Sequence, residues 1–302
     1  MSIDWDVLVI GRSYAGLSAA LNLGRARRSV LVIGSGGPRN DAVLHAHGLI
    51  TNDGALPADI IAAAEAELAK YPTVEQVDAR VTGLVATLGG FRASINGRTA
   101  TASTVLIATG VNDNPPPIAG LAEYWGRGVF TCPYCDGFER ADTHIAVMGS
   151  PLVMPHMTRL LTNWSGRVTA FHDGFDDATR ADLIAHGVEV ETRAVAKVIG
   201  DASSATALEL DDGTVVPIGG LFIGEFPQPN NQLAVGLGCE VDEFGFVTAD
   251  AFGRTTVADV WAIGDVTSRR ATMAIAIAAG VNAAADCNAV LLERRWAAHV
   301  AG

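Results

Sequence analysis

Two cysteines separated by two residues are the strongest chemical signal in the sequence. They lie in the run Cys132-Pro133-Tyr134-Cys135-Asp136. Cysteines at this spacing can form a reactive disulfide, and the spacing lowers the pKa of one thiol. Asp136 follows directly and could move a proton to or from the departing thiolate. The segment therefore predicts thiol–disulfide chemistry, with Cys132, Cys135 and Asp136 as the catalytic residues.

One half of a zinc site is the alternative interpretation of this pair. A structural zinc site needs two further ligands at close spacing. Cys239 and Cys287 each stand alone, and His144 is the nearest histidine downstream. We therefore expect no metal site. Cys239 and Cys287 are interpreted as buried small apolar residues.

A glycine-bearing turn near the start of the chain indicates a nucleotide-binding unit. The apolar run 6–11 predicts a buried strand, and the small residues at helical spacing over 14–24 predict a helix. Gly11 permits the tight turn, Gly16 lets the helix pack closely, and Ser13 is small enough for backbone to approach a pyrophosphate. The motif is weak when taken alone, so a purely structural turn in an ordinary α/β sheet is the alternative.

The second strand, residues 29–34, ends without the acid that usually binds an adenosine ribose. The run Gly34-Ser35-Gly36-Gly37 stands there instead. We expect backbone groups, Ser35 and Arg39 to hold the adenosine side of a nucleotide.

Further strands and helices alternate along the chain, which predicts an α/β fold. Three consecutive prolines within 112–120 can continue neither a helix nor a central strand, so a domain boundary is expected there. A second strand–helix–strand unit is expected to begin at 144–149. The other expected elements are helices at 58–70 and 273–292, strands at 104–110, 167–171, 188–190, 221–224 and 260–265, and a hairpin over 208–216.

Length and charge narrow the class of protein. The chain has 302 residues, which favours two domains, and its 21 basic and 33 acidic side chains give a net charge of −12. Binding to nucleic-acid phosphates needs clustered cations, so we expect no nucleic-acid partner. The longest uncharged apolar run, 271–285, is too short to span a bilayer, and the N-terminus lacks the features of a signal peptide. A cytoplasmic protein without a membrane partner is the expectation.

Several motifs in this order resemble those of the low-molecular-weight thioredoxin reductases. The resemblance implies an α/β fold of two Rossmann-like, three-layer (ββα) domains. It places an FAD-binding domain in 1–112 and 243–302, and an inserted NADPH-domain-like segment that carries the cysteines in 113–242. It also implies a homodimer. The matching pieces are GRSYAGLSAA (11–20), VLIATG (105–110), GRGVFTCPYCDGF (126–138), AIGDV (262–266) and the closing helix 274–284.

The resemblance also implies roles for individual residues. Cys135 would face the flavin, Cys132 would exchange with the substrate, and Asp136 would be the general acid/base. His45 and His47 precede a Gly-rich loop; we interpret them as solvated or core histidines, with approach to the flavin as the alternative. The implied FAD contacts are Gly11, Ser13, Ala15 and Gly16 at the pyrophosphate, Thr109 and Gly110 along the cofactor, Asp265 at the ribityl or pyrophosphate region (otherwise a surface turn residue), and Thr272 and Met273 near the polar edge of the ring.

The chain departs from the reductase pattern where NADPH should bind. The run that starts at Gly149 has Pro151 in place of the second glycine and Met154 in place of the small residue. Pro151 removes an N–H and adds bulk where backbone must approach a phosphate. The alternative is divergence that preserved binding through other contacts, such as Arg167 or Arg180. Where the reductases carry cations for the 2′-phosphate, this chain carries the acids Asp173, Asp176 and Asp177.

The combination of an intact cysteine pair with a lost NADPH motif resembles the FAD-dependent dithiol oxidases that close disulfides in natural products such as gliotoxin and holomycin. That resemblance implies oxidation of a small-molecule dithiol, with O₂ as acceptor and without NADPH. One alternative is a thioredoxin reductase that acts on a thioredoxin-like protein and takes electrons from NADPH or from another donor, such as ferredoxin. Another is a non-catalytic FAD-binding sensor.

Overall fold

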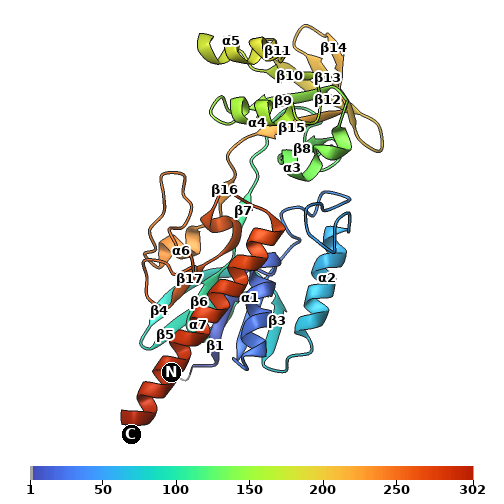
Figure 1. The fold of residues 1–302 in the computed structure, drawn as a ribbon. Coiled ribbons are helices and arrows are strands. Elements are labelled where there is room, and N and C mark those ends of the chain that lie inside the picture. Colours follow the sequence, from blue (N-terminus) through green and yellow to red (C-terminus); the bar gives the residue numbers. More distant parts are fainter. Residues whose placement is uncertain (1–2, 302) are drawn as a thin grey trace. The chain divides into compact units, whose positions relative to one another are not determined.

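The computed structural model describes residues 3–301 and has an α/β fold (Figure 1). Its helices are α1 (Tyr14–Arg25), α2 (Pro57–Leu68), α3 (Pro133–Asp136), α4 (Met154–Leu161), α5 (Asp177–Ala185), α6 (Gln232–Gly236) and α7 (Met273–Ala301), with 3-10 turns η1 (Phe138–Arg140) and η2 (Gly264–Thr267). Its strands are β1 (Trp5–Ile10), β2 (Val30–Gly34), β3 (Val74–Asp78), β4 (Val81–Thr87), β5 (Gly90–Ile95), β6 (Arg98–Ile107), β7 (Val111–Asn112), β8 (Val129–Phe130), β9 (Ile145–Gly149), β10 (Val168–Phe171), β11 (Glu189–Glu191), β12 (Val195–Gly200), β13 (Ala205–Leu210), β14 (Val215–Pro217), β15 (Gly220–Gly224), β16 (Gln228–Pro229) and β17 (Val260–Ala262).

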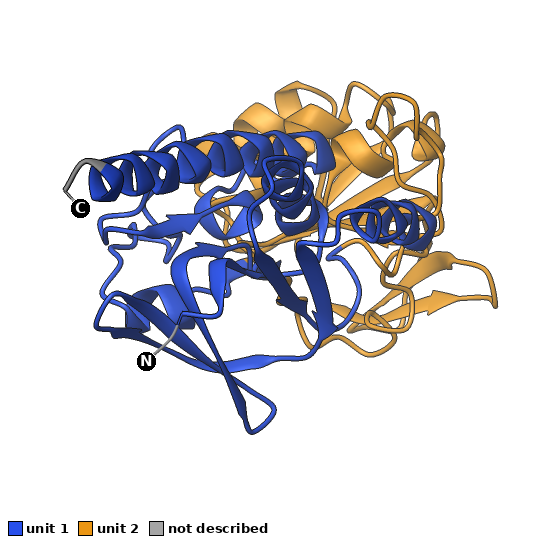
Figure 2. Ribbon diagram, turned by 90° about the horizontal axis from the view of Figure 1, so that it is seen from below, with its two compact units in different colours: residues 1–39, 57–112, 228–302 blue, residues 40–56, 113–227 orange. Residues whose placement is uncertain are grey.

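The described residues form two compact units (Figure 2). Unit 1 comprises residues 1–39, 57–112 and 228–302, and unit 2 comprises residues 40–56 and 113–227. The observed division differs in two places from the boundaries expected from the sequence, because residues 228–242 group with unit 1 and residues 40–56 group with unit 2.

Contacts within each unit explain both differences. Strand β16 pairs with β7, and Ala234 and Cys239 are buried in a core that they share with the unit 1 sheet. In the other segment, a side chain on Gly126 would lie only 2.4 Å from the carbonyl oxygen of Ala42. Such contacts join residues far apart in the chain, so the local pattern of residue types did not reveal them.

Unit 1 is built on a seven-stranded sheet with the order β3-β2-β1-β6-β5-β4, in which β17 also pairs with β6. Strand β1 lies parallel to β2 and β6, and β17 lies parallel to β6. Val7 and Val9 face one core, and Leu8 and Ile10 face the other. Both faces of β1 are therefore buried, which accounts for its continuous apolar sequence.

The C-terminal helix α7 runs beside α1 in unit 1 (Figure 1). A side chain on Gly280 would lie 2.4 Å from the carbonyl oxygen of Ala15, so the glycine allows the two helices to meet closely. Residues Met273–His299 are long and apolar enough to cross a membrane by length and composition alone. Ala283 and Cys287 are nevertheless fully buried in the unit 1 core, as in a core helix. The expected helix over 273–292 is present and continues to Ala301.

Unit 2 repeats the parallel strand–helix–strand arrangement on a smaller sheet, with the order β11-β10-β9-β15-β8. Strand β9 is its centre: Ile145 and Val147 face one core, and Ala146 and Met148 face the other. A separate three-stranded sheet, β12-β13-β14, contains the hairpin that the sequence predicted over 208–216. Strands β4, β5 and β12 were not predicted, because each mixes exposed with buried positions and carries only a weak apolar pattern.

Candidate active site

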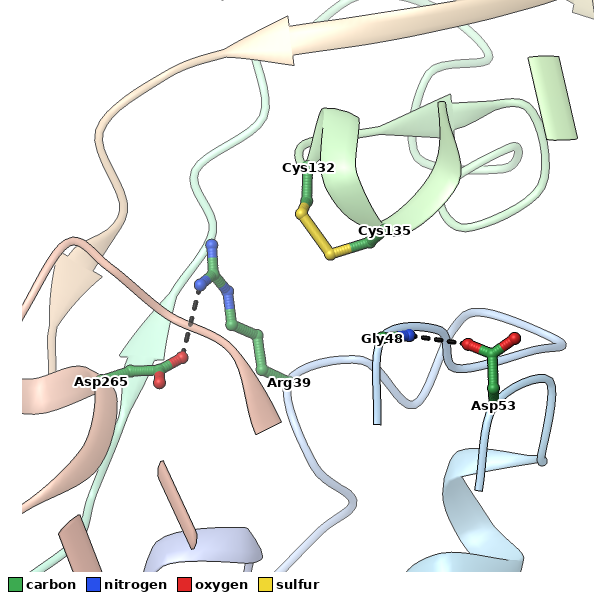
Figure 3. The surroundings of a disulfide bond; sticks show 6 residues. All are labelled: Arg39, Gly48, Asp53, Cys132, Cys135 and Asp265. Atoms are coloured by element: carbon green, nitrogen blue, oxygen red, sulfur yellow. Dashed lines mark hydrogen bonds and ion pairs between the residues drawn. A yellow bond between two sulfur atoms is a disulfide. The ribbon is translucent and has the colours of Figure 1, made fainter. Parts of the chain in front are cut away.

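Cys132 and Cys135 form a disulfide in unit 2, with their Cα atoms 5.3 Å apart (Figure 3). Cys132 precedes the single-turn helix α3, and Pro133 occupies the first helical position, where a backbone N–H is not needed. Both cysteines are half-buried. The helix turn thus holds two sulfur atoms together without removing them from solvent.

Gly137 completes the turn after the cysteines for a steric reason. A Cβ at this position would lie 2.4 Å from the carbonyl oxygen of Pro133 and 2.9 Å from the Trp164 ring. Tyr134, between the two cysteines, is exposed and meets the same Trp164 ring edge-on, with the ring centres 5.8 Å apart. The Trp164 ring therefore packs against the disulfide turn at Gly137 and Tyr134, a contact that the sequence did not suggest.

Asp136 is the titratable group directly beside the disulfide in the sequence. Its side chain is half-buried, and loss of solvation is the main cause that raises the pKa of this carboxyl to about 7. The negative charge of Glu139 raises the pKa further, whereas Arg140 and His47 act in the opposite direction. A carboxyl with a pKa near neutrality is populated in both protonation states, so it can accept or donate a proton there.

A loop of unit 2 contains His47, which was interpreted from the sequence as a solvated or core histidine, with approach to the flavin as the alternative. His47 lies between two carboxylates, with Nδ1 3.5 Å from Asp53 and Nε2 3.4 Å from Glu139. The Asp53 carboxylate also accepts a hydrogen bond of 2.8 Å from the Gly48 N–H, which lowers the pKa of that carboxyl (Figure 3). His45 is exposed, as expected, whereas His47 is half-buried and paired.

In unit 1, the turn between β1 and α1 has the shape that close approach of a ligand requires. Gly11 has a φ of +125°, and a Cβ on it would lie 2.1 Å from the Ala108 carbonyl oxygen. A Cβ on Gly16 would lie 1.9 Å from the Gly11 carbonyl oxygen. Within residues 3–301, the backbone N–H groups of Ser13, Ala15 and Gly16 donate no hydrogen bond. Free donors at a helix N-terminus are suited to an anion such as a pyrophosphate.

The other predicted cofactor residues of unit 1 follow the carboxyl ends of neighbouring parallel strands. Ser35 comes directly after β2 and is exposed, and Thr109 and Gly110 come two and three residues after the end of β6. Gly110 has a φ of +65° and open space where a side chain would be. The carboxyl ends of parallel strands share one edge of the sheet, which is where α/β folds bind ligands.

Asp265 lies on η2, just after β17, and pairs with Arg39 at 3.4 Å (Figure 3). The two residues are 226 positions apart, so the fold brings together two cofactor residues that were predicted independently. The backbone of Gly264 is close to Ala15, since an added Cβ would lie 2.9 Å from the Ala15 Cβ. The η2 turn and the start of α1 are therefore neighbours.

Two further predicted residues stand at the start of α7. The Thr272 hydroxyl accepts a hydrogen bond of 3.2 Å from the Ile275 N–H, so Thr272 caps the helix. Met273 is the first residue of the helix. Asn230 was missed by the sequence analysis: its backbone oxygen accepts the Thr109 hydroxyl at 2.6 Å and its side-chain amide donates to the Thr109 carbonyl at 3.0 Å. An asparagine in a Pro-rich loop carried no signal for this contact.

In unit 2, the corresponding turn between β9 and α4 bonds several of its own backbone N–H groups. Gly149 has a φ of +133°, much like Gly11. The Val153 and Met154 N–H groups both donate to the Ser150 carbonyl oxygen at 3.0 Å, and Pro151 has no N–H. The Leu152 N–H donates to the Ser150 hydroxyl at 3.3 Å. The N–H groups of Val153 and Met154, which correspond to those of Ala15 and Gly16, are therefore already bonded within the turn.

The acids expected to replace the 2′-phosphate cations follow β10. Asp176 caps helix α5 by accepting a 2.7 Å hydrogen bond from the Thr179 N–H, which gives this acid a structural role. Arg180, one of the residues that might have compensated, donates to the Asp173 carbonyl oxygen at 3.3 Å. The carboxylates of this segment leave its charge unfavourable for a phosphate.

Comparison with known proteins assigns this arrangement to a family. Residues 5–280 match the family described as pyridine nucleotide-disulphide oxidoreductase. The chain belongs to this family. Among its relatives, thioredoxin reductase aclD of Aspergillus oryzae is 30% identical over 279 residues, which cover 86% of this chain and 88% of that protein.

Solved structures agree in fold along nearly the whole length. The crystal structure of HlmI superposes with a TM-score of 0.93 at 32% identity, covering 98% of this chain and 95% of that one. An oxidoreductase from Agrobacterium tumefaciens gives a TM-score of 0.88 at 37% identity, covering 96% and 99%. The predicted α/β fold of thioredoxin reductase type is confirmed, and the protein is a flavoprotein oxidoreductase with FAD as its cofactor.

Proposed function

We propose that this disulfide oxidoreductase oxidises a small-molecule dithiol to a disulfide, uses O₂ as the final acceptor, and does not use NADPH. The observation that carries the proposal is the closed β9–α4 turn, where Pro151 lacks an N–H and the Val153 and Met154 N–H groups are bonded to Ser150. Charge-assisted contacts contribute about 1.5–3 kcal/mol each. Without two or three of them, NADPH binding weakens by several orders of magnitude.

The proposed chemistry begins at the disulfide. One thiolate of the substrate attacks the Cys132 sulfur, which forms a mixed disulfide and releases the Cys135 thiolate. The second substrate thiolate then attacks the substrate's own bonded sulfur, which closes the product disulfide and releases the Cys132 thiolate. Two electrons now reside on the two cysteines, and the substrate has lost two protons, one to Asp136 and one to solvent, which balance the two protons of H₂O₂.

Asp136 handles the protons in this scheme. Its carboxylate accepts a proton from a substrate thiol, because the attacking species is the thiolate. Burial and the nearby Glu139 raise the pKa of this carboxyl to about 7, so it is a stronger base than an ordinary aspartate and is still substantially ionised at neutral pH. The same property lets it return the proton when the cysteines are oxidised again.

The residues of unit 1 fit the cofactor. Free N–H groups at Ser13, Ala15 and Gly16 would hold the pyrophosphate, and open space at Gly110 leaves room beside the backbone. When bound, FAD supplies an acceptor for the electron pair of the two cysteines, and O₂ removes that pair as H₂O₂. The net reaction converts one dithiol and one O₂ into one disulfide and one H₂O₂.

The test is anaerobic spectroscopy of the FAD-loaded protein with one reagent at a time. Dithiothreitol should bleach the flavin absorbance within seconds, and air should restore it with release of H₂O₂. Millimolar NADPH or NADH should leave the spectrum unchanged over the same interval. The Cys132→Ser variant is the control, since it should resist bleaching by dithiothreitol as well. Rapid bleaching by NADPH followed by reduction of a thioredoxin would contradict the proposal.

A second candidate is reduction of a thioredoxin-like protein with electrons from a donor other than NADPH. Two observations favour it: Asp136 directly follows the cysteines, as in the reductases, and relatives carry the name thioredoxin reductase. Flavin that is reduced chemically under anaerobic conditions and then reoxidised by an oxidised thioredoxin, but not by O₂ at a comparable rate, would select this candidate.

We also expect a homodimer. Ile275, Val281, Leu292 and Trp296 of α7 are exposed apolar side chains, and Trp296 is 72% exposed. Apolar side chains repeated along one helix are typical of a helix with a partner. Light scattering of the FAD-loaded protein checks the mass, and a monomer at micromolar concentration would contradict the expectation.

A further inference from the structure

The loop from His45 to Ala55 is held in one conformation by its own backbone. The Ala46 N–H donates to the Ala55 carbonyl oxygen, and the Gly54 N–H donates to the Ala46 carbonyl oxygen, each at 2.8 Å. Ala46 is 3% exposed, so the residue next to His47 is buried. These contacts fix the backbone on both sides of His47.

Both ring nitrogens of His47 contact carboxylates, and these carboxylates come from different parts of unit 2. Asp53 is on the same loop, and its carboxylate is itself fixed by the Gly48 N–H. Glu139 is on η1, three residues after Asp136 and one turn from the disulfide helix. The imidazole therefore connects the loop to the short segment that contains the Cys132–Cys135 disulfide and Asp136.

We propose that His47 is a positioning residue for Asp136: held between Asp53 and Glu139, it sets the electrostatic field in which the Asp136 carboxyl exchanges protons. The proposal rests on the proposed function only in treating Asp136 as the acid/base. When the imidazole carries a proton, it places positive charge 3.4 Å from Glu139, whose negative charge would otherwise act fully on its neighbour Asp136.

The charged groups around Asp136 predict a measurable effect on its titration. Glu139 raises the pKa of Asp136, whereas His47 and Arg140 lower it. Arg140 is held separately, with its guanidinium 5.1 Å from the centre of the Phe130 ring and a hydrogen bond of 3.3 Å to the Gly219 carbonyl oxygen. Neutralising His47 and neutralising Glu139 should therefore move the Asp136 titration in opposite directions. A merely structural role for the pair would not produce opposite signs.

The experiment titrates Asp136 directly in the full-length FAD-loaded protein. Carboxyl-¹³C aspartate labelling gives the NMR signals, and Asp136→Asn identifies the signal of interest by its loss. His47→Gln should raise the titration midpoint and Glu139→Gln should lower it, each by about half a pH unit, as expected for partly exposed charge pairs. His47→Arg, which keeps a positive charge, should stay near the wild-type midpoint.

His45 offers a matched control on the same loop. It is exposed, and its Nδ1 lies 3.0 Å from the Gly54 carbonyl oxygen rather than against a carboxylate. His45→Gln should leave the midpoint unchanged. The midpoint of the pH–rate profile for flavin bleaching by dithiothreitol should shift in the same directions as the NMR midpoints.

Midpoints that move in the same direction in His47→Gln and Glu139→Gln, or that do not move, would overturn the proposal. Because Glu139 is on the surface, Glu139→Gln keeps the test decisive if His47→Gln folds poorly: a midpoint unchanged in Glu139→Gln alone is also a refutation. Opposite NMR shifts in a protein that does not oxidise dithiols would retain the role of His47 and reject the proposed function instead.

Discussion

The strand–turn–helix connections β1–α1 and β9–α4 share the conformation of their first glycine. They differ in the residue five positions later. Gly11 and Gly149 adopt nearly the same backbone conformation, with φ values of +125° and +133°. Five residues later the first turn has Gly16 and the second has Met154. Met154 is fully buried in the core of unit 2, so its size is accommodated by the packing there.

The two turns differ in whether their backbone N–H groups are hydrogen-bonded within the protein. At the first turn the N–H groups of Ala15 and Gly16 have no acceptor within the described chain, whereas the equivalent groups of Val153 and Met154 donate to Ser150. The glycine and the positive φ thus form the turn, whereas unbonded N–H groups form the anion site. A fold can therefore keep the architecture of a nucleotide-binding unit after losing its means of binding a phosphate.

The largest effect is expected from a change that leaves both turns intact. Cys132→Ser should abolish dithiol turnover, since a serine hydroxyl cannot exchange with a disulfide. FAD occupancy should remain at the wild-type level, because the predicted FAD contacts belong to unit 1. Turnover and the flavin-to-protein absorbance ratio are the two measurements. Cys239→Ala, at a buried free cysteine, is the control that should keep turnover. Wild-type turnover in Cys132→Ser would reject the paired-cysteine mechanism.

Asp136→Asn should slow dithiol oxidation by about 10²–10⁴-fold, the usual contribution of a general acid or base. In the wild type, the rate of flavin reduction by a dithiol should rise as the pH passes about 7, because the carboxylate is the form that accepts the thiol proton. In Asp136→Asn, the rise in rate near pH 7 should disappear. Only the rise caused by ionisation of the substrate thiol should remain. A reduction of less than tenfold would reassign Asp136 to a structural position in the turn.

Gly16→Ala and Met154→Ala test the two turns at equivalent positions. The alanine Cβ at position 16 would lie 1.9 Å from the Gly11 carbonyl oxygen, so the turn must shift. Such overpacking costs about 1–3 kcal/mol, and FAD affinity should fall by roughly 10–100-fold. Met154→Ala should leave FAD affinity unchanged and only destabilise unit 2. Equal loss of FAD in both variants would show that the first turn has no special role.

Asp265→Ala should lower FAD affinity by about tenfold through loss of one hydrogen-bonding carboxylate. It also removes the ion pair between Arg39 and Asp265, at 3.4 Å. Arg39→Ala is the matched variant, since it breaks the same pair from the other side. FAD titration by fluorescence quenching measures both, and an unchanged affinity in Asp265→Ala would count against its assigned contact.

The smallest effect is expected from Pro151→Gly. The change adds one N–H to the second turn, but the Val153 and Met154 groups stay bonded to Ser150. NADPH binding, followed by calorimetry, should therefore improve by less than about threefold, a fraction of one hydrogen bond. Tight binding in this variant would mean that Pro151 alone blocks the site, and the explanation from the satisfied donors would be wrong.

The α/β fold of both units and the thiol–disulfide class of chemistry could be predicted from the sequence. Continuous apolar runs such as 6–11 need burial on both faces, which only a central parallel strand supplies. Gly11 and Gly149 predicted tight turns because other residues avoid their backbone conformation. The Cys132–Cys135 spacing is local as well, so the pair was recognisable without any fold.

Which side chains meet, and which backbone N–H groups remain unbonded, depends on tertiary contacts. His47 and Glu139 are 92 positions apart, and Arg39 and Asp265 are 226 apart, so nothing in either local sequence predicts the contact. The same holds for residues 40–56, which belong to unit 2 because they pack against residues such as Gly126. Several acceptors can compete for one N–H. Whether Ser150 or a phosphate accepts the N–H groups of Val153 and Met154 depends on atomic positions, which residue types do not specify.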